Sequence, residues 1–286
     1  MSGPTLVVAG KTSMAVAGAI AVREAADARG HHDPVLVVPN RTDEGRPDWQ
    51  PSLRHFAQIT PGFEIVQLKD VYSRHELHFF SLEFDRLLHT EQTTSTALFN
   101  IHFSLLPADK GMSTSIWPIL DGRSESGVTL HRIARGIDTG PIIAQTRFGI
   151  GADDTGRDLY LNYIRHGTEL FVSHIDSLLD GTYVATSQPA EGSSYHSKSD
   201  LDYGNPVPTF ARTAYELRNR IRAFTFPEYQ SVIVDGLRVT ASHITDDLSS
   251  EPPGAVTDRG PGSRRIATID FELVLIGEDV ASIGDE

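Results

Sequence analysis

The chain has 286 residues, of which 39% are hydrophobic and 22% are charged, a composition typical of a soluble globular protein with one large domain and a smaller one. It contains no cysteine, which excludes disulfides, thiolate zinc sites, iron–sulfur clusters and a cysteine nucleophile. The formal net charge of −13 argues against a nucleic-acid-binding surface, which needs clustered Lys and Arg, but does not exclude a local basic pocket for one small phosphorylated ligand.

The N-terminus reads Met-Ser-Gly-Pro and then continues into an apolar run. It lacks the basic start and the small-residue cleavage site of a signal peptide. No stretch reaches the ~18 consecutive apolar residues that a transmembrane helix requires. We therefore expect a cytoplasmic protein with no membrane partner.

A strand, a helix and a second strand are predicted at the start of the chain. Residues 5–9 (TLVVA) and 34–38 (PVLVV) are short and apolar, whereas residues 14–28 are rich in Ala and are followed by Gly30. This β-α-β order predicts a parallel sheet with right-handed crossovers. Residues 39–53 are polar, contain three prolines and are predicted to form a loop.

The pattern of short apolar runs continues to about residue 180. One helix is predicted from Asp154 or Thr155 to about Leu179, with Gly181 just after it. Apolar runs predict strands at residues 63–68, 78–82, 97–102, 127–133 and 141–147. Together with the β-α-β start, these elements predict an α/β fold whose sheet is mainly parallel.

A change of composition marks the boundary to a second module. Residues 182–210 are rich in Ser, Tyr, Asp and Pro, so we predict domains at residues 1–182 and 183–286. Downstream, the patterns predict a helix at 212–225, a hairpin at 231–244 around Asp235-Gly236, a polar linker at 245–264 and a strand at 266–276. The C-terminal module is therefore expected to be small and mixed or β-rich.

The segment from Asn100 to Gln145 carries the chemistry. Asn100 and His102 end a predicted strand, at the edge where open α/β sheets bind ligands, and side chains two residues apart face the same side. Asp138 lies in the turn sequence IDTG. His131, in VTLHRI, is interpreted as a structural or exposed strand residue. We expect Asn100, His102 and Asp138 to share one pocket.

An amide, an imidazole and a carboxylate suit acyl transfer to an amine. The amine must be neutral when it attacks, the tetrahedral intermediate needs hydrogen-bond donors for its oxyanion, and the leaving nitrogen must receive a proton. His102 is suited to transfer the proton, and Asn100 is suited to donate a hydrogen bond to the oxyanion. Asp138 is suited to orient His102 and to balance the positive charge of the amine. No covalent intermediate is required.

The string NIHFSLLP…KG…WPIL.G…GVTLHRI..GIDTGPIIAQ resembles the signature of the folate-dependent formyltransferase superfamily. The resemblance covers roughly residues 5–180 and is most specific between residues 100 and 145. It implies a Rossmann-like formyltransferase domain, an Asn–His–Asp trio at Asn100, His102 and Asp138, and N10-formyltetrahydrofolate as co-substrate with no metal ion. By the same resemblance, the pterin of the folate would lie against Leu82, Phe84, Leu87, Leu88, Ile137, Thr139 and Gly140.

Two features resemble the amino-sugar N-formyltransferases within this superfamily. One is KGMSTSIWPIL, and the other consists of SSYHSKSD (193–200) and RNRIRAFTFPEY (218–229). They imply an acceptor amine on a nucleotide-linked deoxysugar. Because sugar-acting relatives tend to be dimers, the resemblance also implies a homodimer.

Six further residues are candidates for acceptor binding. The loop after the first strand can contact a ligand in sheets of this type, and the lysine after the strand with the trio is a candidate for a substrate phosphate. The alternative, purely structural interpretations are that the lysine is an exposed loop residue, that the histidine stabilises its loop and that the tryptophan belongs to the core. The candidates are Gly10, Lys11, Lys110, Trp117, Tyr195 and His196.

Other functions stay open at this point. The acceptor can be a non-sugar amine, such as a hydroxyornithine or an antibiotic precursor, because only the acceptor pocket would differ. Hydrolysis of formyltetrahydrofolate would release formate without an acceptor. Formylation of methionyl-tRNA is disfavoured by the acidic residues 201–286, which carry eight Lys and Arg against fourteen Asp and Glu. An intact trio argues against a binding protein without catalysis.

Overall fold

The computed structural model describes residues 3–280, so the first two residues of the predicted N-terminal domain and the last six of the C-terminal module lie outside it. The described chain divides into two compact units that are built from interleaved segments. Unit 1 contains the residues up to Gly111, Gly127–Phe148 and Asn162–Tyr195, and unit 2 contains Met112–Ser126, Gly149–Leu161 and the residues from His196 onward. The single domain boundary at residue 182 stays a prediction.

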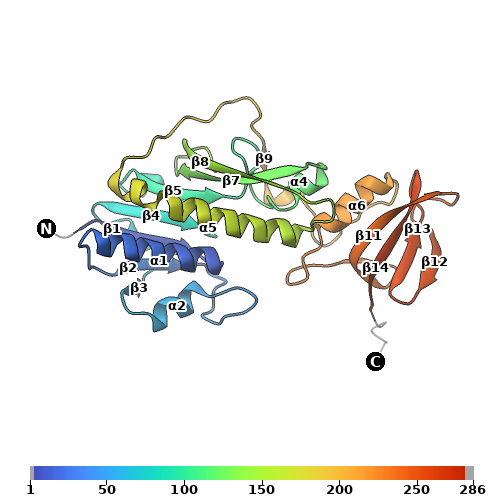
Figure 1. Ribbon diagram of the computed structural model, residues 1–286, viewed down its shortest axis with the longest axis horizontal. Helices are drawn as coiled ribbons and strands as arrows, with labels where there is room; N and C mark the ends of the chain where they lie inside the picture. The colour runs from blue at the N-terminus through green and yellow to red at the C-terminus, as the bar shows by residue number, and fades with distance from the viewer. Residues whose placement is uncertain (1–2, 281–286) are drawn as a thin grey trace. The chain divides into compact units, whose positions relative to one another are not determined.

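Unit 1 is built on a seven-stranded sheet with the order β3-β2-β1-β4-β5-β7-β8 (Figure 1). The first five strands of this order pair in parallel, and β7 pairs with β5 antiparallel. The predicted α/β fold with a mainly parallel sheet is therefore confirmed. The strands are β1 (Thr5–Gly10), β2 (Val35–Pro39), β3 (Phe63–Ile65), β4 (Leu77–Leu82), β5 (Ala97–His102), β7 (Glu125–Arg132) and β8 (Ile142–Gly149).

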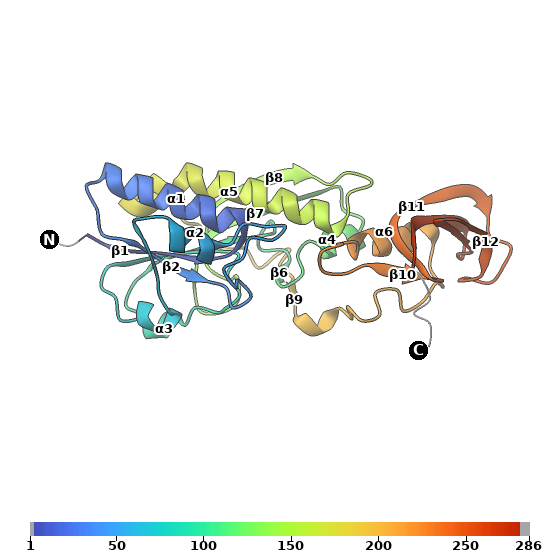
Figure 2. The same cartoon turned by 90° about the horizontal axis from the view of Figure 1, so that it is seen from below.

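Two long helices, α1 (Thr12–Ala28) and α5 (Gly156–Asp180), lie side by side along one face of this sheet (Figures 1 and 2). In α1 the residues at positions 15, 19, 22 and 26 are buried, which is the helical spacing of a face that packs on a core. The helices predicted at 14–28 and from residue 154 or 155 to about 179 are confirmed. Within residues 3–280, no helix combines the length and the apolar character that crossing a membrane would need.

Shorter elements occur in both units, with α4 and η2 in unit 2. Ser52 caps α2 (Leu53–Ile59), so the predicted loop 39–53 ends where this helix begins. The strand predicted at 63–68 was too long, because the chain turns after Ile65 into α3 (Leu68–Val71). The remaining short elements are η1 (Thr90–Gln92), β6 (Lys110–Gly111), α4 (Trp117–Leu120), β9 (Tyr195–His196) and η2 (Lys198–Asp200), of which β6 and β9 pair with each other.

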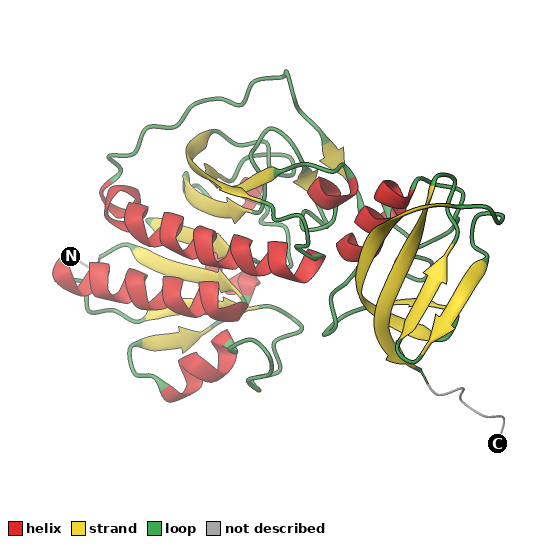
Figure 3. Ribbon diagram, turned by 45° about the vertical axis from the view of Figure 1, so that its right-hand side comes forward, coloured by secondary structure: helices red, strands yellow, loops and turns green. Residues whose placement is uncertain are grey.

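The C-terminal part of unit 2 is an antiparallel five-stranded sheet with the order β10-β11-β14-β13-β12, against which α6 (Ala214–Ala223) packs (Figure 3). Asp235 and Gly236 both have positive φ angles, 47° and 70°, as a tight hairpin turn between β10 and β11 requires. The predicted hairpin and the β-rich module are confirmed. The strands are β10 (Val232–Val234), β11 (Leu237–Leu248), β12 (Val256–Gly260), β13 (Ser263–Ile266) and β14 (Phe271–Asp279).

Two predictions for this module were wrong. Residues 245–264, predicted as a polar linker, contain the end of β11, all of β12 and the start of β13. These strands are largely exposed, so they lack the apolar alternation that reveals a half-buried strand. The strand predicted at 266–276 is interrupted at residues 267–270, between β13 and β14.

Candidate active site

Strand β5 supplies two side chains of the candidate active site. Asn100 and His102 are two residues apart and therefore face the same side of the sheet. The antiparallel register places His131 of β7 opposite Asn100, and Thr129 opposite His102. Residues directly opposite each other also share a face, so four polar side chains meet at this point of unit 1.

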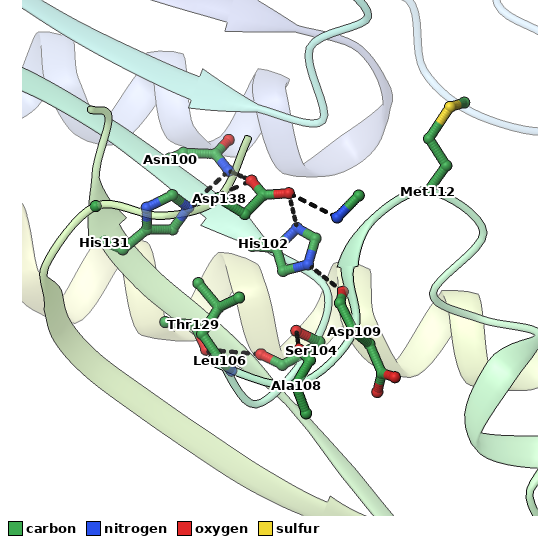
Figure 4. A network of polar contacts seen from close by, with 12 residues as sticks. Asn100, His102, Ser104, Leu106, Ala108, Asp109, Met112, Thr129, His131 and Asp138 are labelled. Carbon is green, nitrogen blue, oxygen red and sulfur yellow. Dashed lines mark hydrogen bonds and ion pairs between the residues drawn. The ribbon is translucent and has the colours of Figure 1, made fainter. Parts of the chain in front are cut away.

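Asp138 completes a network of polar contacts with these side chains (Figure 4). Its Oδ2 atom lies 3.4 Å from Nδ1 of His102 and accepts a hydrogen bond of 2.9 Å from the backbone N–H of Gly111. Its Oδ1 atom accepts a long contact of 3.5 Å from Nδ2 of Asn100. The predicted trio thus lies together, while the catalytic role of each member stays a prediction.

The turn that carries Asp138 is held from several sides. Asp138 itself has a φ of 53°, a left-handed conformation that is uncommon outside glycine. Thr139 donates through Oγ1 to the carbonyl of Arg135, over 3.0 Å. Gln188, which the sequence analysis missed, donates through Nε2 to the carbonyls of Asp138 and Gly140, over 2.7 and 2.8 Å. These bonds fix the direction of the carboxylate.

Gly140 allows the turn to approach β7 closely. A Cβ atom at this position would lie 1.7 Å from the carbonyl oxygen of Arg132, so the backbone would have to move. Gly140→Ala is therefore expected to destabilise the protein by about 1–3 kcal/mol and to displace Asp138, lowering kcat about tenfold or more. Thermal unfolding and kcat measure the two effects. Gly149→Ala is the control, because its added Cβ would meet nothing closer than 3.9 Å; equal behaviour of both variants would contradict the argument.

The hydrogen bonds of His102 define its protonation. The ring is 7% exposed, and Nε2 lies 2.8 Å from the carbonyl oxygen of Asp109, which can only accept. Nε2 therefore carries a proton, and in the neutral ring the lone pair is on Nδ1, beside Asp138. Burial lowers the pKa of His102, although the charge of Asp138 opposes this effect. A neutral His102 can accept a proton at Nδ1.

Asp138 is held in its ionised form. Burial by itself would raise the pKa of this carboxyl, but His102, His131 and the N–H of Gly111 outweigh burial and lower the pKa to about 2. The carboxylate and Nδ1 of His102 present two acceptors to the same point. An ammonium group bound there can donate to both, which suits the deprotonation of an amine.

The lowered pKa of Asp138 has a consequence for stability. Its folded pKa of about 2 lies below the ordinary value of 3.8, so the ionised carboxylate stabilises the fold above pH 4, and this contribution is lost as the pH falls toward 2. Asp138→Asn is expected to cost about 2 kcal/mol at pH 7, and the difference from the unsubstituted protein should shrink below pH 4. Denaturant titrations at several pH values measure this. A difference that is independent of pH would contradict it.

His131 takes a larger part in the site than the sequence analysis gave it. It is 2% exposed, its Nδ1 donates to the carbonyl of Arg132 over 2.8 Å, and its Nε2 therefore accepts from Nδ2 of Asn100 over 3.0 Å. The amide of Asn100 thus points its nitrogen at His131 and Asp138. Alternation along β7 could have revealed this residue, because positions 129 and 131 share one face.

The residues predicted to contact the pterin divide into two groups. Leu82 is buried, and Phe84 and Leu88 pack against a hydrophobic core formed by β1, β2 and β4 together with one residue each of α3 and β5. Leu87 and Ile137, in contrast, are 63% and 36% exposed and present apolar surface. Thr139 and Gly140 stabilise the turn that carries Asp138, Thr139 by a hydrogen bond and Gly140 by its lack of a side chain. Pterin binding by these residues stays a prediction.

Three acceptor candidates of unit 1 have structural partners. Gly10 has a φ of 152°, and a Cβ atom there would lie 1.8 Å from the carbonyl oxygen of Leu82, so close strand packing explains the glycine. Lys11 forms an ion pair with Glu83 over 3.6 Å, and Lys110 donates through Nζ to Oγ of Ser193 over 2.9 Å. Tyr195 is 52% exposed.

Two further candidates meet in unit 2. The indole of Trp117 stacks on the imidazole of His196, with ring centroids 4.0 Å apart and an interplanar angle of 11°. Nε1 of Trp117 donates to the carbonyl of Met112 over 3.2 Å. Trp117 is only half-buried, so the interpretation as a core residue does not hold. His196 is half-buried as well, and Met112, whose carbonyl accepts from the indole, is exposed.

Comparison with known proteins assigns this geometry to a family. A family model described as formyl transferase matches residues 82–175, which include the whole trio. Methionyl-tRNA formyltransferase of Myxococcus xanthus is 32% identical over 177 residues, covering 62% of this chain and 56% of the relative. That of Paraburkholderia phytofirmans is 34% identical over 171 residues, covering 57% and 50%. The chain thus spans about half the length of these curated relatives.

Solved structures match nearly the whole chain. The sugar 3N-formyl transferase WlaRD, crystallised in the presence of dTDP and 5-N-formyl-THF, is 37% identical with a TM-score of 0.85, covering 96% of this chain and 97% of that one. An N-formyltransferase from Helicobacter canadensis in complex with folinic acid and dTDP-3-aminofucose is 38% identical with a TM-score of 0.85, covering 96% and 99%.

Proposed function

The chain belongs to the folate-dependent formyltransferase family, and on this premise we propose that it transfers a formyl group from N10-formyltetrahydrofolate to the primary amine of a nucleotide-linked amino-deoxysugar. The arrangement of Asp138 beside Nδ1 of His102, 3.4 Å apart, carries the proposal because it suits the deprotonation of an amine. The two similar sugar-acting enzymes match 96% of the chain, and thus include its C-terminal module.

The charge of the chain supports a small acceptor over methionyl-tRNA. Residues 201–286 carry eight Lys and Arg against fourteen Asp and Glu, and the whole chain has a net charge of −13. A surface that binds tRNA needs clustered cations to neutralise phosphates. The two curated tRNA-acting relatives named above, moreover, match 62% and 57% of this chain.

The residues of unit 1 fit a pterin at the loops 82–88 and 137–140. Leu87 and Ile137 offer exposed apolar side chains. Oε1 of Gln188 is buried beside the second loop without a hydrogen-bond partner in the part of the chain that the structure describes, which suits an N–H donor of a pterin. N10-formyltetrahydrofolate would supply the formyl carbon that the acceptor nitrogen attacks.

The trio would then handle the charges and protons of this transfer. The Asp138 carboxylate orients the acceptor amine, and Nδ1 of His102 accepts the proton that the amine loses. The same nitrogen of His102 can return the proton to the leaving nitrogen. An N–H of Asn100, which now makes the 3.5 Å contact with Asp138, can donate to the developing oxyanion.

An acceptor competition tests the proposal. The purified protein is incubated with N10-formyltetrahydrofolate and an equimolar mixture of dTDP-linked 3-amino and 4-amino sugars, hydroxyornithine and methionyl-tRNA, and formylated products are identified by mass spectrometry. A formylated nucleotide sugar is the expected product. Formylation of hydroxyornithine or of methionyl-tRNA alone would overturn the acceptor assignment.

A further inference from the structure

After α5 the chain returns to β9 as a long strap, residues 183–194 (Figure 1). The strap contains no helix or strand, and one isolated bridge, from Thr186 to Ile142, ties it to β8 by two backbone hydrogen bonds of 2.8 Å. Most of its residues are exposed, but four are half-buried: Tyr183, Ala185, Gln188 and Ser194. Two of these four side chains hold parts of the candidate active site.

Gln188 holds the turn that carries Asp138. Its Nε2 atom donates to the carbonyl of Asp138 over 2.7 Å and to the carbonyl of Gly140 over 2.8 Å, so one amide group spans the turn. The φ angle of Asp138, 53°, lies in the left-handed region, where a residue other than glycine stays only when its surroundings hold it. Gln188 supplies this support from the strap.

Ser194 holds the loop on which His102 rests. Its Oγ atom accepts a hydrogen bond of 2.7 Å from the backbone N–H of Asp109, and its carbonyl accepts one of 3.0 Å from the N–H of Lys110. Asp109 also has a φ of 53°. The carbonyl of Asp109 accepts the Nε2–H of His102 over 2.8 Å, which leaves the lone pair of the neutral ring on Nδ1. The tautomer of His102 therefore depends on a loop that Ser194 fixes.

The two supports converge on one pair of atoms. Nδ1 of His102 and Oδ2 of Asp138 lie 3.4 Å apart, and the position of each depends on the backbone of a left-handed aspartate that the strap binds. Resting on the proposed function, we propose that the strap is a positioning device for formyl transfer, in which Gln188 aims the carboxylate and Ser194 sets the tautomer of the imidazole. Both side chains act through the trio and are therefore positioning residues.

Loss of either support is tested by one substitution. Gln188→Met keeps the length of the side chain without its hydrogen bonds, and Ser194→Ala removes the acceptor for the N–H of Asp109. Each variant is expected to lower kcat about tenfold, because even a small misplacement of reacting groups is costly. The comparison uses kcat at saturating folate, because Gln188→Met also removes Oε1, the proposed acceptor for the pterin.

Ser187→Ala is the matched control. Ser187 precedes Gln188, is exposed and forms no side-chain hydrogen bond within residues 3–280. We expect its kcat to equal that of the unsubstituted protein. Thermal unfolding establishes that each variant is folded at the assay temperature. Because the two supports are removed one at a time, a variant that does not fold leaves the other to decide.

The pH dependence of kcat separates positioning from a general loss of structure. The groups that act on His102 are the carboxylates of Asp138 and Asp109, the carbonyl of Asp109 and the ring of His131. Asp138 and the hydrogen bond to the Asp109 carbonyl raise the pKa of His102 against the larger effect of burial. Release of either should lower this pKa further, so the acidic limb of the pH–rate profile moves to lower pH in both variants. Loss of folded protein alone lowers the rate and leaves the limb in place.

Nitrogen NMR of ¹⁵N-histidine-labelled protein reports the state of His102 without turnover. The signals of His102 are identified by their absence in His102→Ala. We expect the Nε2–H tautomer in the unsubstituted protein and in Ser187→Ala. In Ser194→Ala the proton should move in part to Nδ1, where the Asp138 carboxylate can accept it. In Gln188→Met the tautomer should stay and the pKa of the ring should fall.

The outcomes separate this inference from the proposed function. A kcat within about threefold of normal in both variants overturns the inference and leaves the function standing. A lowered kcat with an unmoved acidic limb and an unchanged His102 tautomer also overturns it, because the strap would then serve stability alone. If no acceptor is formylated, the function fails, and NMR alone decides the inference: a changed tautomer or pKa of His102 in the variants supports it, and unchanged values overturn it.

Discussion

His102→Ala is expected to lower kcat by at least ~10²-fold while the protein stays folded. The imidazole is the only side chain of the trio that can both accept and return a proton near neutral pH, and such a group typically contributes 10²–10⁴-fold. Burial lowers its pKa, so the proton-accepting form prevails at pH 7 and the rate should fall only on the acidic side.

A matched substitution controls for the loss of a histidine. His32 lies in the loop after α1 with 77% of its side chain exposed, so His32→Ala removes the same group far from the trio. Its kcat should equal that of the unsubstituted protein. A rate for His102→Ala within threefold of normal would remove proton transfer by His102 from the mechanism.

Asp138→Asn is expected to lower kcat to a similar extent, by ~10²-fold or more. The substitution keeps the shape of the side chain but removes the charge that attracts the acceptor amine, and the new amide can donate to Nδ1 of His102, which occupies the lone pair that would accept the amine's proton. Because the turn at residues 138–140 is held by Gln188 and Thr139, the backbone should stay in place. The loss should therefore appear in kcat more than in the KM for folate.

Asp33→Asn provides the control for this charge change. Asp33 is an exposed residue in the loop before β2, and its replacement removes one negative charge without touching the site. We expect unchanged kinetics. If Asp138→Asn retained more than about a third of the normal kcat, the carboxylate would have no part in handling the amine.

Much of unit 1 follows from local sequence. The runs TLVVA and PVLVV are buried on both faces, as the central strands β1 and β2 are, and such runs stay recognisable without any partner. Helix α1 is equally easy to predict from the sequence, because its buried alanines recur at helical spacing. The antiparallel pairing of β7 with β5 could not be deduced in this way, because it depends on strand order rather than on composition.

The small sheet of unit 2 was harder to predict. Strand β12 reads VTDRG and is mostly exposed, so no apolar period distinguishes it from a loop. The turn at Pro261-Gly262, which joins β12 to β13, was the available signal. Recognising it would have required knowing that the flanking residues pair.

The site shows the same division between local and distant information. Asn100 and His102 follow from their spacing on one strand, and Asp138 from its turn sequence. Gln188 and His131 were missed as parts of the site because each acts through contacts with residues 31 to 50 positions away.

The most direct test of the account measures where the formyl group goes. The protein is incubated with N10-formyltetrahydrofolate carrying a ¹³C-labelled formyl group and with a dTDP-linked 3-amino sugar, and labelled product and labelled formate are quantified side by side. We predict that nearly all of the label appears as a formamide on the sugar, and that omission of the sugar stops folate turnover. Release of labelled formate at the same rate with or without the sugar would contradict formyl transfer and indicate a hydrolase.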